Sequence, residues 1–136
     1  MNHKVLFGHE KLTVYQKALE FIEWSDQVCA KIHWNVNARI HLEKASDSII
    51  FNIAEGNGKF TANDRCRFFD IAHGSALECS GCLDSLLARK KISEAELLLG
   101  KSQLKEIVSM LIGLIKSNSD RIYEPNEEYE TDPTPV

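Results

Sequence analysis

One stretch decides the fold of this chain: Ser48-Ile49-Ile50-Phe51-Asn52-Ile53-Ala54-Glu55-Gly56-Asn57-Gly58. Its apolar residues continue a three- and four-residue spacing that starts upstream, and this spacing is typical of an α-helix. It predicts a helix over residues 38–55, with one face formed by Leu42, Ala45, Ile49 and Asn52 or Ile53. We expect the helix to end at Gly56 and Gly58, because glycine adopts the positive φ of a C-terminal cap without steric strain.

The same periodicity continues on both sides of this helix. Ser93 and Glu96 have the spacing of a capping box, in which each side chain satisfies a backbone N–H of the first helical turn. The spacing predicts three more helices, over residues 12–32, 62–90 and 93–119. The apolar stripe of the first is expected to consist of Leu12, Tyr15, Ala18, Leu19, Ile22 and Cys29 or Ile32.

Four amphipathic helices with short connections predict an all-α protein, an up-down-up-down four-helix bundle. No proline interrupts residues 1–124. The bundle is expected to span residues 12–119, after an N-terminal segment at 1–11 and before an acidic tail at 120–136 that we expect to be disordered.

Two features of the predicted helices suggest close contacts with other chains or segments. Small residues gather in the middle of the third helix, where Gly74 and Gly81 would allow close backbone approach. The fourth helix is apolar on more than one side, and such a helix needs a second partner surface. We therefore expect the protein to self-associate.

Length and composition favour one ordinary domain of 136 residues. No apolar run approaches the roughly 18 residues that span a membrane, and the first residues lack the apolar core of a signal peptide. We therefore expect a cytoplasmic protein whose four cysteines are reduced.

The net charge of −4 is unevenly distributed. Residues 120–136 contain six acidic residues and one basic residue, so the remaining chain has a net charge of +1. Two local groups of cations stand out in that nearly neutral part. They are Lys59, Arg65 and Arg67 around the connection between the second and third helices, and Arg89, Lys90 and Lys91 at the end of the third helix. Both groups are candidate nucleic-acid contacts, and the alternative is ordinary solvated charge that complements helix ends.

Asn52, Glu55 and Glu78 are the candidate polar cluster. Asn52 and Glu55 share a helical face, so with Glu78 they would form either a paired-carboxylate acid/base site or a buried structural network. The network is the preferred interpretation. Cys79 and Cys82 are interpreted as core thiols, because no second ligand pair completes a zinc site. No glutamate is followed three residues later by histidine, which excludes the usual di-iron bundle motif. We expect no catalytic residue, no metal and no cofactor.

Several motifs resemble those of a known family. They are Leu12–Ala18, Ser48–Gly58, Arg67–Glu78, Ile92-Ser93-Glu94 and Leu111–Ile115. Together these motifs, over about residues 7–118, resemble the four-helix-bundle proteins named for the 23S rRNA intervening sequence. The accessory variability proteins of diversity-generating retroelements are similar.

The resemblance implies a ring-like homopentamer without enzymatic activity. It also implies a scaffold that binds RNA or a nucleic-acid enzyme such as a reverse transcriptase. The alternative is a structural homo-oligomer that acts through a protein partner and has no nucleic-acid role.

Overall fold

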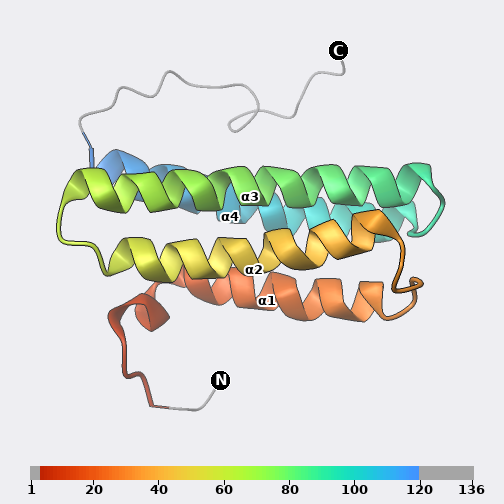
Figure 1. Ribbon diagram of the computed structural model, residues 1–136, viewed down its shortest axis with the longest axis horizontal. Helices are drawn as coiled ribbons and strands as arrows, with labels where there is room; N and C mark the ends of the chain where they lie inside the picture. The colour runs from red at the N-terminus through yellow and green to blue at the C-terminus, as the bar shows by residue number, and fades with distance from the viewer. Residues whose placement is uncertain (1–3, 120–136) are drawn as a thin grey trace.

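The computed structural model describes residues 4–119, which form four α-helices and no strand (Figure 1). A short 3₁₀ helix, η1 (Gly8–Lys11), precedes them. The helices are α1 (Thr13–Cys29), α2 (Asn37–Asn57), α3 (Ala62–Ala88) and α4 (Glu94–Ser117). The predicted number and order of helices are confirmed, although α1 ends three residues earlier than expected. The prediction for the acidic tail, residues 120–136, lies outside the described residues.

The helices form an antiparallel four-helix bundle, as predicted. Each helix packs against the next one in the chain, and α4 returns to pack against α1. Among the described residues the diagonal pairs do not contact each other, and α2 and α3 make the most extensive pair. None of the described helices is both long and apolar enough to cross a membrane.

The buried face of α2 follows the predicted periodicity, whereas the predicted stripe of α1 is confirmed only in part, at Ala18 and Cys29. Leu42, Ile49 and Ile53 of α2 are fully buried. In α1 the buried residues include Val14, Ala18, Phe21 and Val28, whereas Leu19 and Ile22 are only half-buried. Apolar residues fill two overlapping stripes of this helix, and contact with both α2 and α4 buries the stripe that periodicity alone did not select.

Hydrogen-bonding caps start the last two helices. The Thr61 Oγ1 accepts from the backbone N–H of Asp64. The predicted capping box of α4 is confirmed: Ser93 Oγ accepts from the N–H of Glu96 at 3.1 Å, and Glu96 accepts from the N–H of Ser93 at 2.9 Å. A hydrogen bond from Lys31 and the capping contacts lower the pKa of Glu96.

The prediction that glycines cap α2 with a positive φ is wrong. The helix continues through Gly56 to Asn57, and Gly58 has φ −87°. Gly56 is instead buried against α3, where an added Cβ would lie 2.8 Å from Cε1 of Phe69. The position needs glycine for close approach of the two helices rather than for a left-handed backbone.

Close approach within the chain occurs at Gly100 and not at the two glycines expected to provide it. A Cβ on Gly100 would lie 2.5 Å from Cη2 of Trp24 and 2.7 Å from Cδ1 of Leu83. Gly74 and Gly81 have no neighbouring atom within 4 Å of that position. Their prediction is therefore wrong for contacts within residues 4–119, because both glycines are exposed on α3.

Gly100→Ala is expected to destabilise the protein by about 1–3 kcal/mol, because the new methyl group overlaps a Trp24 ring and a fully buried Leu83. Gly113→Ala on the same helix is the matched control. It points into open space and is expected to stabilise the helix by up to about 1 kcal/mol. Urea unfolding of the two variants measures both changes. Equal effects would contradict the proposed packing.

Candidate nucleic-acid interface

The two predicted basic groups lie at opposite ends of the bundle. Lys59, Arg65 and Arg67 surround the connection between α2 and α3, whereas Arg89 and the residues after it lie at the C-terminal end of α3 (Figure 1). The 27 residues of α3 separate the two ends by about 40 Å at the helical rise per residue. The chain therefore has two separate cationic regions rather than one continuous surface.

Arg65 is engaged in holding the α2–α3 connection. Its Nη1 donates to the carbonyl oxygens of Lys59 and Phe60 at 3.1 and 2.9 Å, and its Nε donates to Oδ1 of Asn118 at 2.7 Å. This guanidinium thus ties the connection to the end of α4. Its Nε and Nη1 are engaged in structural hydrogen bonds, and its predicted phosphate contact stays a prediction.

The other two cations of this group flank an aromatic ring. Lys59 Nζ lies 4.9 Å and Arg67 Cζ lies 5.2 Å from the ring centroid of Phe68. Arg67 also forms an exposed ion pair with Asp64 at 3.8 Å. Both cations therefore stay at the surface and are available to a ligand.

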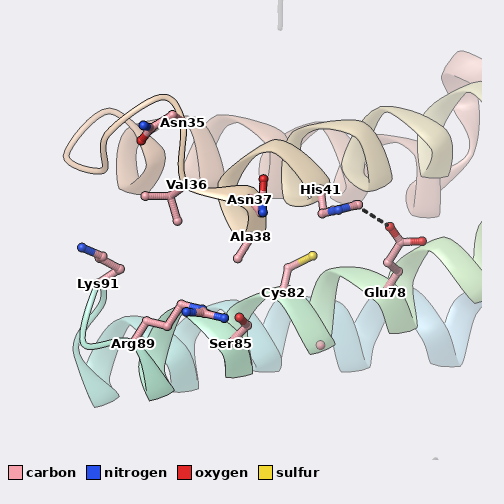
Figure 2. A pocket seen from close by; sticks show the side chains of 11 residues that line it. Asn35, Val36, Asn37, Ala38, His41, Glu78, Cys82, Ser85, Arg89 and Lys91 are labelled. Atoms are coloured by element: carbon pink, nitrogen blue, oxygen red, sulfur yellow. Dashed lines mark ion pairs between the residues drawn. The ribbon is translucent and has the colours of Figure 1, made fainter.

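A shallow cleft of about 600 Å³ lies at the other end, between the start of α2 and the end of α3. Figure 2 shows His41 and Asn37 on the α2 side, facing Ser85 and Arg89 on the α3 side. His41 Nδ1 and a carboxylate oxygen of Glu78 lie 4.0 Å apart across the cleft and form an ion pair when the histidine is protonated. Sequence reasoning found Arg89 and Lys91 but missed His41 and Ser85, which only the helix pairing brings beside them.

The cleft favours an anionic ligand on the part of its wall near the end of α3. Within residues 4–119 neither Arg89 nor Lys91 forms an ion pair with an acidic side chain. No side chain caps the first turn of α2, so the positive end of that helix adds to the field of the two cations. A phosphate group at this end would meet two cations that form no ion pair with an acidic side chain of residues 4–119.

Lys90 has a structural position of its own. Its φ is 61°, the one positive value at a non-glycine position among the described residues. The N–H of Lys91 donates to the carbonyl of Leu86 at 2.8 Å, and that of Lys90 donates to Leu87 at 2.9 Å. This pattern is a Schellman motif, which normally has glycine at the left-handed position.

The expected network of Asn52, Glu55 and Glu78 does not form. Glu55 and Glu78 are both exposed, and Glu78 pairs with His41. Asn52 instead donates to the carbonyl oxygen and the hydroxyl of Ser48. Ser75 of α3 donates to the same hydroxyl at 2.7 Å. The polar link between α2 and α3 is built from hydroxyl and amide groups, which are less costly to desolvate than carboxylates.

The cysteines are core thiols, as predicted. All four are free and buried. Burial raises the pKa of Cys29 to about 11, and burial also raises the pKa values of Cys79 and Cys82. No group of three His, Cys, Asp or Glu side chains in the described part of the chain is arranged to hold a metal ion.

The chain is similar to known families and structures. A family model described as "23S rRNA-intervening sequence protein" matches residues 10–113. The fold resembles the crystal structure of a protein with unknown function from the S23 ribosomal protein family of Bacteroides thetaiotaomicron. The two share 22% sequence identity and a TM-score of 0.70, over 76% of this chain and 99% of that chain. At this identity the likeness shows the fold alone. No curated protein matches the chain.

Lys90→Gly is expected to raise the free energy of unfolding by about 1 kcal/mol, because glycine relieves the left-handed backbone strain. Lys91→Gly removes the same charge one residue later, where no positive φ exists, and is expected to give no gain. Chemical denaturation of both variants measures the difference. A stabilised Lys91→Gly, or a destabilised Lys90→Gly, would contradict this account of the helix end.

Proposed function

The chain belongs to the 23S rRNA-intervening sequence protein family, and on that premise we propose that it is a non-enzymatic, oligomeric scaffold that binds RNA. One observation carries the RNA ligand. Arg89 and Lys91 border a cleft of about 600 Å³ and are not neutralised by any acidic side chain among the described residues. Exposed lysine and arginine side chains bind RNA chiefly through its phosphate groups.

The negative net charge does not oppose this ligand. The excess of acidic residues belongs to residues 120–136, and the rest of the chain has a charge of +1. Two or three phosphate contacts per subunit give only weak binding. An oligomer multiplies such contacts, because a bound RNA raises the effective concentration of every neighbouring site.

The proposed assembly is a ring-like homopentamer that uses the outer face of α3. Ile71 and Leu77 on this helix are 47% and 44% exposed, although both are large apolar residues. Gly74 lies between them with open space above its backbone, whereas Gly81 lines the cleft. A neighbouring copy packed here would bury the apolar side chains and approach Gly74 closely. This contact would supply, at Gly74, the close approach that the sequence suggests and that no segment within residues 4–119 provides.

The proposed protein partner is a nucleic-acid enzyme such as a reverse transcriptase, as in the retroelement branch that the chain resembles. Its strings Ala18–Phe21, Asp64–Phe69 and Leu77–Cys79 support this relation. An RNA ligand and four free thiols are consistent with a cytoplasmic location.

One observation favours the second candidate, a structural homo-oligomer that acts through a protein partner alone. A hollow of about 730 Å³ lies between the N-terminal segment and α1. Leu6 and Phe7 on its wall are 73% and 65% exposed, and Glu20 and Glu23 add negative charge. Such a surface suits a basic, apolar protein segment better than a phosphate.

Double charge reversal of Arg89→Glu and Lys91→Glu is expected to abolish most RNA binding at moderate salt, because it replaces two phosphate contacts with repulsion. A plot of log K against log salt should lose about 1.4–1.8 of its slope. The matched control is Lys11→Glu with Lys44→Glu, two exposed lysines outside both groups. Filter binding over a salt series measures both. Equal losses in the two double variants, or no binding by the wild type, would refute the cleft as an RNA site.

Light scattering behind size exclusion is expected to give the mass of a pentamer. Ile71→Lys with Leu77→Lys should lower that mass, because charges replace the apolar contacts of the α3 face. Phe51→Lys on α2, a residue that is 58% exposed, is the control and should leave the mass unchanged. A monomeric wild-type protein would refute the assembly. A pentamer that is insensitive to the α3 variants would refute this interface.

A further inference from the structure

Phe60 is the most exposed large apolar residue among residues 4–119, at 99% exposure. It lies in the connection between α2 and α3, at the end of the bundle opposite the cleft. Isolated exposed apolar residues are common on protein surfaces and need no special explanation. Phe60 differs from such residues in two respects, which are the rigidity of its backbone and the charge around it.

Hydrogen bonds on both sides of Phe60 restrain the backbone that carries it. The Arg65 guanidinium donates to the carbonyl oxygens of Lys59 and of Phe60 itself, and its Nε is fixed by Asn118. The next residue, Thr61, caps α3. The ring is therefore presented to solvent by a fixed support, so little conformational entropy is lost when a ligand covers it.

Two cations lie on the same part of the chain as Phe60, although they contact the neighbouring ring of Phe68 rather than Phe60 itself. Lys59 precedes it, and both Lys59 and Arg67 are drawn toward the ring of Phe68 at 4.9 and 5.2 Å. These contacts restrain two flexible side chains near the exposed aromatic residue. Proteins bind single-stranded nucleic acid by combining exposed aromatic rings, on which bases stack, with cations that pair with the phosphates. The α2–α3 connection and the first turns of α3 carry both kinds of group.

We propose that Phe60 is a stacking platform for an unpaired base of single-stranded RNA, with Lys59 and Arg67 contacting the adjoining phosphates. The proposal rests on the RNA ligand proposed above and adds a second, chemically different contact at the opposite end of the bundle. An unpaired base offers both of its faces, whereas duplex bases are covered by their neighbours. The site therefore prefers single strands. It also tolerates any sequence, because every base has an aromatic face.

The test is Phe60→Ala in the full chain, with a labelled single-stranded RNA of about ten nucleotides and a duplex of the same length. Loss of one stacked base is expected to weaken single-strand binding by about 5- to 100-fold while the salt slope stays unchanged. Phe60→Trp should restore binding. Phe51→Ala is the matched control, because Phe51 is 58% exposed on α2 outside both basic groups. Lys59→Gln with Arg67→Gln should instead lower the salt slope by about 1.4.

The outcomes separate this proposal from the RNA function itself. If Phe60→Ala binds as the wild type does while the Arg89/Lys91 reversal loses binding, the platform is wrong and the RNA function stands. If the wild type binds no RNA, both fall. If Phe60→Ala changes the mass of the oligomer and leaves RNA affinity intact, the ring contacts a second copy and the stacking proposal is overturned. An unchanged unfolding midpoint shows that the variant is folded, as expected for a side chain outside the core.

Discussion

The close packing of α2 against α3 is the constraint on which the rest of the structure depends. These two helices make the most extensive pair in the bundle. Gly56 leaves room for the Phe69 ring, and the Ser48 hydroxyl accepts a hydrogen bond from Ser75 across the pair. Because the two helices are antiparallel and lie side by side, their packing fixes the positions of the groups at both ends of the pair. One end presents the short connection that carries Phe60, and the other leaves the cleft bordered by Arg89.

The sequence predicts those features that depend on neighbours within one or two helical turns. The capping box at Ser93 and the four helices are predictable because the residues that indicate them lie within a few positions of one another. The buried stripe of α1 is not fully predictable, since two stripes of this helix are apolar and only contact with α2 and α4 decides which one is buried. The glycines show the same limit. Gly100 packs against Trp24 of another helix, while Gly74 has no neighbour within 4 Å among the described residues, and composition does not distinguish the two.

The candidate site is predictable to the same extent. Cation clusters are visible in the sequence, and both groups were found there. Which cations are engaged is a tertiary property. Nη1 and Nε of Arg65 donate to two backbone carbonyl oxygens and to Asn118, whereas Arg89 has no acidic partner among the described residues. Phe60 was missed because a phenylalanine in a short connection carries no signal of its exposure. Glu55 and Glu78 are spaced along their helices as if they shared a face with buried residues. That spacing does not show whether the carboxylates lie between α2 and α3 or in solvent, where the structure places them.

Assembly through the outer face of α3 would explain how two weak sites could together hold one RNA. This face runs along the bundle between the cleft and the Phe60 connection. In the proposed ring it would pack against a different surface of the next copy, because contact of one face with itself gives a two-fold dimer. Cyclic symmetry with its axis along the helices places equivalent ends on the same side of the ring. Each cleft then lies beside the clefts of its neighbours, and each stacking residue lies beside its equivalents. A flexible RNA that reaches one site finds the next at high effective concentration, so modest contacts accumulate into specific retention. The chain therefore needs no strongly basic surface to hold RNA, provided that it assembles.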